Sequence, residues 1–194
     1  SGSAADLVLA FAGTVTEHTG TVTITDAPSV AELKEINAQS TGAITLQVTN
    51  GALSGSAADL VLAFAGTVTE HTGTVEITNN HNLAQLAEIN SESTGTITLN
   101  DYTVALTGSS ASVSAALDGT FAQAYTGTVS LSDAPSVAEL KNINAGTTGA
   151  ITLQVTNGAL SGSAADLVLA FAGTVTEHTG TVTITDAPSV AELK

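Results

Sequence analysis

Three glutamate–histidine pairs are the residues of this sequence whose types are best suited to chemistry. They stand in the same Glu-His-Thr-Gly segment, as Glu17-His18, Glu70-His71 and Glu177-His178. Imidazole and carboxylate groups bind zinc, so a repeated metal site is one interpretation. Each copy, however, supplies a single histidine, and a diverged copy has Tyr125 in its place. Adjacent residues of an extended loop also point apart. We therefore favour a solvent-facing loop for these pairs.

Oxygen ligands for calcium form the second candidate. Acidic or amide residues stand shortly before predicted helices, at Asp26, Asn79, Asp133 and Asp186, and Asp101 lies in an Asn-Asp-Tyr segment. Calcium needs 6–8 oxygens, and the sequence has neither an EF-hand nor a glycine-rich nonapeptide pattern. Helix capping explains these residues without a metal. Capping is the favoured interpretation, and a calcium site stays open as the alternative.

The remaining candidates for chemistry are weaker. His81, in Thr-Asn-Asn-His-Asn, is typical of a turn. Serine is plentiful, but pairs such as Gly55-Ser56 match helix caps and not a nucleophile elbow. The 18 glycines form no phosphate-binding loop, and the absence of cysteine excludes thiolate catalysis. We assign no catalytic, cofactor-binding or metal residue, identify no small-molecule substrate, and predict that the protein is not an enzyme.

Charge and composition exclude several kinds of partner. The 194 residues carry 3 lysines and 18 acidic residues, for a net charge of −15. Such a chain cannot displace counterions from phosphates, so we predict no nucleic-acid partner. The longest apolar run, Leu7 to Ala12, is too short to cross about 30 Å of hydrocarbon, so no membrane-spanning segment is predicted. With 43% hydrophobic residues, the chain is not a disordered acidic tail.

Internal repetition is the main feature of the sequence. The phrase SGSAADLVLAFAGTVTEHTGTV begins at Ser1, Ser54 and Ser161, and a diverged copy begins at Thr107. Residues 1–34 and 161–194 are identical. The chain therefore divides into repeat 1 (1–53), repeat 2 (54–106), a diverged repeat 3 (107–160) and a partial repeat 4 (161–194).

Two parallel strands are predicted in each full repeat. Thr-Gly followed by alternating apolar residues is typical of a strand. We expect strands to begin within two residues of Thr19, Thr41, Thr72, Thr94, Thr126, Thr148 and Thr179. The long half of a repeat has room for a further extended piece, such as 102–106. The apolar residues of each strand, for example Val22, Ile24, Val182 and Ile184, should be buried.

Helices are predicted between the strands. A capping box at Ser29 and Glu32 precedes a helix with Val30, Leu33 and Ile36 on one face, and the signal returns at Ser136 and Ser189, with a variant at Asn82. A second helix, SAADLVLAFA, begins at Ser3, ends before Gly13, and recurs from Ser56, Ser163 and, more weakly, Ser110. It is apolar nearly all round, so we expect it to be well buried.

Strands joined through helices must be parallel. The prediction is thus an α/β repeat solenoid, with a parallel β-sheet, helices packed along it and about two βα units per 53-residue repeat. Rows of threonine on such a sheet also occur in ice-binding proteins. Because Ala43, Gln47, Glu76, Asn100 and Gln154 interrupt the rows, a plain solvated face is favoured.

The repeats resemble those of a known class of proteins. The segments TGTVTITDAPSVAELKEINAQSTGAITL and TLNDYTVALTGSSASVSAAL are similar to repeat regions of giant extracellular and cell-surface proteins of cyanobacteria. The resemblance covers essentially the whole chain and carries no catalytic residue. It implies a non-enzymatic structural segment of a long extracellular protein that forms a filament or a cell-surface fibre. A calcium-stabilised adhesin stalk or binding module is the alternative.

The chain ends bear on the partner. Neither Ser1 nor Lys194 stands in a polar capping repeat, and an uncapped solenoid exposes its stacking face. We therefore expect either covalent continuation into more repeats or self-association of identical units, with the former favoured.

Overall fold

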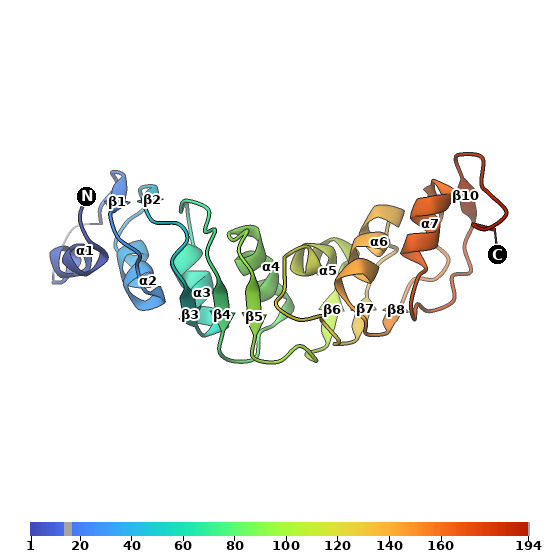
Figure 1. Ribbon diagram of the computed structural model, residues 1–194, viewed down its shortest axis with the longest axis horizontal. Helices are drawn as coiled ribbons and strands as arrows, with labels where there is room; N and C mark the ends of the chain where they lie inside the picture. The colour runs from blue at the N-terminus through green and yellow to red at the C-terminus, as the bar shows by residue number, and fades with distance from the viewer. Residues whose placement is uncertain (14–16, 194) are drawn as a thin grey trace. The chain divides into compact units, whose positions relative to one another are not determined.

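The protein has an α/β architecture in which one or two short strands stand between successive helices (Figure 1). The computed structural model describes residues 1–13 and 17–193. Within these ranges the helices are α1 (Ala4–Phe11), α2 (Val30–Ala38), α3 (Ala57–Phe64), α4 (Leu83–Ser91), α5 (Ser110–Leu117), α6 (Val137–Gly146) and α7 (Ala164–Ala170). The strands are β1 (Val22–Ile24), β2 (Ile44–Leu46), β3 (Leu53–Gly55), β4 (Val75–Ile77), β5 (Ile97–Leu99), β6 (Leu106–Gly108), β7 (Val129–Leu131), β8 (Ile151–Leu153), β9 (Leu160–Gly162) and β10 (Val182–Ile184).

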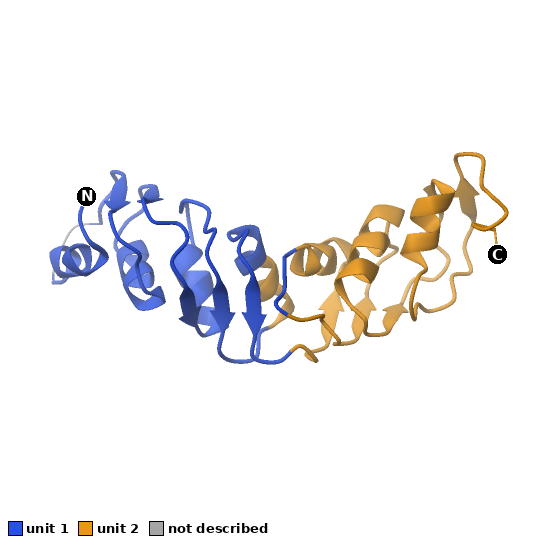
Figure 2. Ribbon diagram, viewed as in Figure 1, with its two compact units in different colours: residues 1–81, 88–101, 119–122 blue, residues 82–87, 102–118, 123–194 orange. Residues whose placement is uncertain are grey.

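Two compact units make up the chain (Figure 2). Unit 1 comprises residues 1–81, 88–101 and 119–122 and holds two sheets, β1-β2 and β3-β4-β5. Unit 2 comprises residues 82–87, 102–118 and 123–194 and holds the sheets β6-β7-β8 and β9-β10. Every described strand pair is parallel, which confirms the predicted direction of the strands.

The register of the strands follows the repeat. Val22 pairs with Ile44, Leu53 with Val75, and Val75 with Ile97, each at an offset of 22 residues. In the diverged repeat the offset from Leu106 to Val129 is 23, because this repeat carries one extra residue. Strand pairing therefore joins neighbouring segments of the chain and not distant ones.

The predicted strand starts are wrong by one residue. The strands begin three residues after each threonine, at Val22 after Thr19 and at Ile97 after Thr94, for example. The Thr-Gly pairs instead form close crossings of the backbone. A methyl group on Gly42, Gly95 or Gly149 would overlap the backbone carbonyl of the glycine 22 residues earlier. Glycine is needed there because a side chain has no room, and the regular strand begins only beyond the crossing.

Three strands were not predicted at their true positions. β3, β6 and β9 each precede a helix of the SAADLVLAF type and pair with the next strand. The extended piece expected at 102–106 overlaps β6 only at Leu106. Each of these strands carries one buried leucine before Ser-Gly or Thr-Gly, which is too short a pattern to show alternation.

Each of the seven described helices begins with a side-chain cap near its predicted start, and at α5 the cap is Ser109, one residue before the predicted Ser110. Ser29 and Ser136 form complete capping boxes with Glu32 and Glu139. At α4, the Asn82 amide donates to Gln85 Oε1 and the Gln85 amide donates to Asn82 Oδ1, both at 3.0 Å. The hydrogen bonds that Glu139 accepts from the backbone amide and hydroxyl of Ser136 lower the pKa of Glu139.

The core lies between the strands and one face of each helix. The alternating strand residues of β1, β2, β4, β5, β7 and β8 are buried, as predicted. The helix residues facing them are fully buried, and they are Leu33, Ile36, Leu86, Ile89, Leu140 and Ile143. Burial of a leucine or isoleucine side chain contributes about 1.5–3 kcal/mol, so these helix faces stabilise the fold substantially.

The strand predicted after Thr179 is present as β10, but the burial predicted for Val182 and Ile184 and the helix predicted after Ser189 are wrong. Val182 is 44% exposed and Leu193 is 62% exposed, whereas Val22 and Leu33, at the same places in the identical sequence, are 3% and 0% exposed. Residues 190–193 form turns and not the helix expected after Ser189. The reason is packing: β1 lies beside β2, and the described residues provide β10 with no equivalent of β2.

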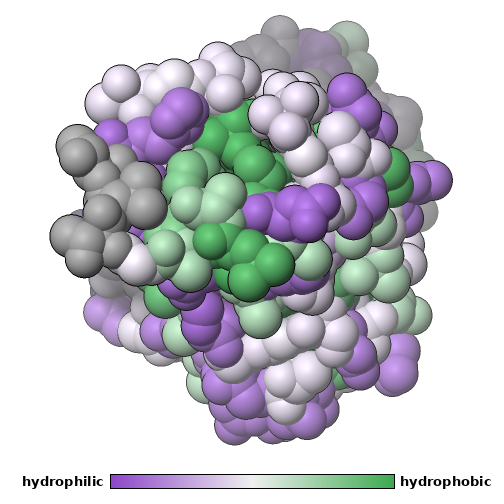
Figure 3. Space-filling model, turned by 90° about the vertical axis from the view of Figure 1, so that its left-hand side faces the viewer, coloured by the Kyte–Doolittle hydropathy of each residue, from purple (hydrophilic) through white to green (hydrophobic). Residues whose placement is uncertain are grey.

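The SAADLVLAFA helices are less buried than predicted. In α1 only Ala4 and Leu7 are buried, and Leu9 is 73% exposed. The equivalent Leu62 and Leu169 are 54% and 53% exposed. Figure 3, which looks at the molecule from the side on which α1 lies in Figure 1, accordingly shows apolar side chains at the surface. Among the described helices, none is long and apolar enough to cross a membrane.

Candidate functional site

The three Glu-His-Thr-Gly histidines occupy separate and dissimilar sites. Each ring lies against a phenylalanine of the preceding helix, with centroids 5.9–6.0 Å apart, in the pairs Phe11–His18, Phe64–His71 and Phe171–His178. His18 is exposed and His178 is half-buried, but His71 is only 2% exposed. The solvent-facing loop predicted for these histidines is therefore wrong for His71.

Burial sets the electrostatics of His71. Neither ring nitrogen has a hydrogen-bond partner of good geometry. Burial lowers the pKa of His71, and the nearby backbone of Thr74 and Gly51 raises it in part. In the diverged repeat, Tyr125 takes the equivalent place, is fully buried, and donates from Oη to the Val104 carbonyl at 2.6 Å. The position is therefore a buried packing site that either an imidazole or a phenol ring can occupy.

His81 is also a packed residue. It lies in the loop before α4, as predicted for a turn residue, but it is 4% exposed. Burial lowers its pKa, and the charge of Asp101 raises it in part. A neutral imidazole is the favoured form in such an environment.

The aspartates before the helices cap a different helix from the one we expected. Asp26 Oδ1 accepts from the Ala4 amide at 2.7 Å, and Asp133 Oδ1 accepts from the Ser110 amide at 2.7 Å. Asn79 and Asp186 do the same for Ala57 and Ala164, at 2.8 and 2.9 Å. Capping is confirmed, but each residue caps the helix about 22 residues before it. These aspartate and asparagine side chains hold neighbouring segments together, which the sequence pattern alone did not reveal.

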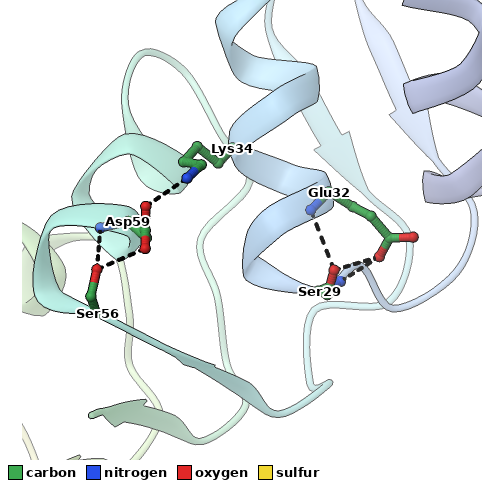
Figure 4. Close-up of polar contacts among 5 residues, drawn as sticks. All are labelled: Ser29, Glu32, Lys34, Ser56 and Asp59. Carbon is green, nitrogen blue, oxygen red and sulfur yellow. Dashed lines mark hydrogen bonds and ion pairs between the residues drawn. The ribbon is translucent and has the colours of Figure 1, made fainter. Parts of the chain in front are cut away.

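Two ion pairs form a second link between neighbouring segments. Lys34 Nζ lies 2.6 Å from Asp59 Oδ1, and Lys141 Nζ lies 2.6 Å from Asp166 Oδ1. Figure 4 shows Lys34 extending from α2 toward α3, where Asp59 also accepts from the hydroxyl of Ser56. The bonds from Lys34 and Ser56 lower the pKa of Asp59. Because solvent reaches both partners and screens their charges, such a pair contributes little to stability.

Asparagine side chains form a third link. Asn37 Nδ2 donates to the carbonyls of Leu62 and Ala65 at the end of α3, at 3.0 and 2.5 Å. Asn144 Nδ2 donates to the Leu169 carbonyl at 2.8 Å in the same way. The last carbonyls of a helix lack intrahelical partners, so these amides satisfy acceptors that would otherwise need water. The Ile-Asn-Ala motif was the sequence signal, and it was not assigned a role.

The structure brings no candidate residues together into a reactive cluster. Among the described residues there is no group of three or more histidine, aspartate and glutamate side chains that could hold a metal ion. The predicted threonine rows are divided among separate sheets: Thr23 lies beside Thr45 in one, Thr98 beside Glu76 in another, and Thr183 beside Ser161 in a third. This interrupted pattern offers no flat array of identical side chains.

The surface depressions are shallow and largely apolar. One, of about 480 Å³, is lined by Leu83, Ala84, Ala87, Ala111, Ser112 and Ala115 on α4 and α5. Another, of about 390 Å³, lies beside Lys34, Asn37, Gly66 and Leu62. The second also has the hydroxyl residues Ser40, Thr41 and Thr67 in its lining, but the amine of Lys34 beside them is paired with Asp59.

Comparisons with known proteins add no family to this description. The scan against family models, the search of curated proteins and the search of solved structures each give no match.

Proposed function

We propose that the protein is a non-enzymatic structural segment in which the strand–helix units stack as an α/β solenoid within a longer extracellular repeat protein. In this proposal the array forms a filament or a fibre at the cell surface. The supporting observation is the constant offset of the links between neighbouring segments. Strand pairs, aspartate caps and glycine crossings all join residues 22 or 23 positions apart.

The same offset gives the proposal its physical basis. A unit that contacts only its neighbours has a stability set by its own folding and by the two interfaces beside it. The identical segments 1–34 and 161–194 fit this description. Val22 and Leu33 are buried where the next segment covers them, and Val182 and Leu193 are exposed where the described chain provides no such cover.

The use of polar residues also supports a structural role. Asp26 and Asp133 cap helices, Lys34 and Lys141 pair with aspartates of the next segment, and Asn37 caps a helix end. These charged and amide side chains thus join neighbouring segments. The extracellular location rests on the sequence resemblance, the self-association or covalent continuation of the array rests on the repeats themselves, and both are parts of the same proposal.

An extended chain tests the stacking directly. Residues 161–194 have the sequence of 1–34, so a second copy of residues 35–194 added after Lys194 continues the repeats in register. A stacked array gains length in proportion to the residues added, and solution scattering should show the maximum dimension of the particle nearly doubling. A matched control carries the same added residues with the order of the repeats 54–106 and 107–160 exchanged.

Two outcomes would contradict the proposal. If the maximum dimension grows only as the cube root of the mass, the units collapse into a globule and do not stack. If the extended chain melts in two unrelated transitions, the second copy folds by itself and the interfaces are absent. A stacked array instead gives a higher melting temperature, because each added interface contributes to stability.

A further inference from the structure

We propose that Asn50 and Asn157 are sites of spontaneous covalent modification, at which the side-chain amide is lost and the main chain is partly rearranged to isoaspartate. Both residues precede glycine, in the identical segment Gln-Val-Thr-Asn-Gly-Ala-Leu. The inference does not depend on the proposed stacking or on the location of the protein. It rests on how the structure treats each asparagine.

The structure separates these two asparagines from the other eight. Asn37, Asn142 and Asn144 donate to carbonyl groups of neighbouring helices. The side chains of Asn79, Asn80, Asn82 and Asn100 are held in hydrogen bonds, and Asn90 also has a partner. In the described structure no hydrogen bond holds the side chain of Asn50 or Asn157, and both residues are exposed. An amide that is not held can rotate toward the following backbone nitrogen.

Packing fixes the glycine that follows each of them. A methyl group on Gly51 would lie 2.8 Å from the Ala27 Cβ, and one on Gly158 would lie 2.6 Å from the Ala134 Cβ. A larger residue is therefore excluded at both positions. Glycine is the residue that least obstructs attack by its own nitrogen, because it has no Cβ. No hydrogen bond within the described chain engages the amide of Gly51 or Gly158. The fold thus retains the reactive Asn-Gly pair for a structural reason.

The chemistry needs only water. The backbone nitrogen of Gly51 loses its proton and forms a bond to Cγ of Asn50. The bond from Cγ to Nδ2 breaks, and ammonia leaves with the proton. The resulting five-membered imide then adds water at one of its two carbonyls. Opening at one carbonyl gives aspartate, and opening at the other gives isoaspartate, in which the main chain runs through the former side chain.

The modification would act on the link to the next segment. The Thr72 and Gly73 amides donate to the Thr49 carbonyl at 2.9 and 3.1 Å, immediately before Asn50. The Asn50 carbonyl carbon would lie only 2.6 Å from a methyl group on Gly73, so the two backbones are in close contact. An isoaspartate adds one methylene to the main chain at this contact. We expect the bonds to Thr49 to weaken, and each event to add one negative charge to an already acidic protein.

The test follows the intact protein during incubation at pH 8 and 37 °C. Each event raises the mass by about 1 Da. Peptide mapping with electron-transfer fragmentation assigns the position and distinguishes isoaspartate from aspartate. A free peptide with the sequence of residues 47–53 provides the reference time. We expect Asn50 and Asn157 to be converted within a few half-times of that peptide, while Asn37 and Asn144 stay intact.

Two variants control the assignment. Asn50→Gln with Asn157→Gln keeps both glycines and replaces the five-membered ring with a slower six-membered one, so the mass gain should be lost. Freshly prepared Asn50→Asp supplies the charge without the altered main chain, because an aspartate before glycine forms the imide more slowly than an asparagine does. If isoaspartate weakens the link, the Thr72 and Gly73 amides should exchange hydrogen faster in aged wild-type protein than in fresh wild-type protein. Asn50→Asp should not show this increase.

Specific results would overturn the inference. Asn50 and Asn157 that stay unmodified over ten half-times of the reference peptide would show that the folded backbone blocks the attack. Equal conversion of Asn37 and Asn144, which are held by hydrogen bonds and precede alanine, would show that neither hydrogen bonding nor the following residue selects the site. A mass gain that persists in the double glutamine variant would place the reaction elsewhere.

Discussion

Replacing Gly95 by alanine should be one of the most destabilising small changes in the protein. Gly95 is buried at a crossing of two backbone segments, and its methyl group would overlap the Gly73 carbonyl. A flexible side chain could move aside, but a backbone carbonyl cannot move without carrying its segment with it. The substitution therefore forces the segments around Gly73 and Gly95 apart.

The magnitude follows from the contacts that must open. Overpacking a rigid site costs about 1–3 kcal/mol or more. The neighbouring bonds from the His71 amide to the Glu92 carbonyl, at 3.0 Å, and from the Thr94 amide to the His71 carbonyl, at 2.9 Å, would lengthen. Each such bond contributes about 1 kcal/mol. We expect a total loss of about 3–5 kcal/mol in the free energy of unfolding.

Gly20→Ala is the matched control. Gly20 stands in the same Thr-Gly pair, but the nearest atom to its methyl group would be the exposed His18 side chain, at 3.2 Å. Removing a glycine also restricts the unfolded chain, so this variant should be neutral or more stable by up to about 1 kcal/mol.

Thermal unfolding followed by circular dichroism measures the difference. For a chain of this size, 1 kcal/mol shifts the melting temperature by about 2–4 °C. Gly95→Ala should therefore melt about 6–20 °C lower than the wild type, and Gly20→Ala within a few degrees of it. Equal melting temperatures for the two variants would refute the view that the Thr-Gly pairs are steric crossings.

Four further predictions concern other parts of the structure. Burial lowers the pKa of His71, so the folded state disfavours its protonation, and the melting temperature should fall as the pH drops from 7.5 through the unfolded pKa near 6.5. His71→Tyr, which introduces the ring found at Tyr125, should make this fall smaller, and a variant with the same pH dependence as the wild type would contradict the prediction. Leu86→Ala should cost about 2–5 kcal/mol in urea unfolding, against under about 1 kcal/mol for the exposed Leu62→Ala, and a loss below 0.5 kcal/mol at Leu86 would mean that its helix face is misassigned. Lys34→Met should change the free energy of unfolding by no more than about 1 kcal/mol, with a larger loss showing that the ion pair is less solvated than its exposure indicates. Chelation with EDTA should leave the melting temperature unchanged, whereas a fall of tens of degrees would favour the calcium-stabilised stalk.

The sequence was most informative where one residue type has one structural use. Ser29 with Glu32 predicted a helix start, and the capping box is present. Alternation in Val-Thr-Ile predicted a strand with Val22 and Ile24 buried, and both are. These features depend on residues within a few positions of one another, so a local pattern contains the whole interaction.

Predictions failed where a contact joins segments 22 residues apart. Asp26 was expected to act on the helix that follows it, but it caps the Ala4 amide of the helix before it. The Thr-Gly pairs were expected near strand starts, but Gly95 is placed by the Gly73 carbonyl. Neither partner can be read from local spacing, because pairing depends on the register between segments.

One segment with three sequence-identical copies shows how far the environment decides burial. The histidine of Glu-His-Thr-Gly is exposed at His18, buried at His71 and half-buried at His178, although each lies against the equivalent phenylalanine of its own repeat. The difference must come from the flanking segments, since the local sequence does not change. At the equivalent position, the Tyr125 hydroxyl donates a hydrogen bond to the Val104 carbonyl, whereas neither ring nitrogen of His71 has a partner of good geometry. The diverged repeat therefore adds a side-chain hydrogen bond between segments at this position.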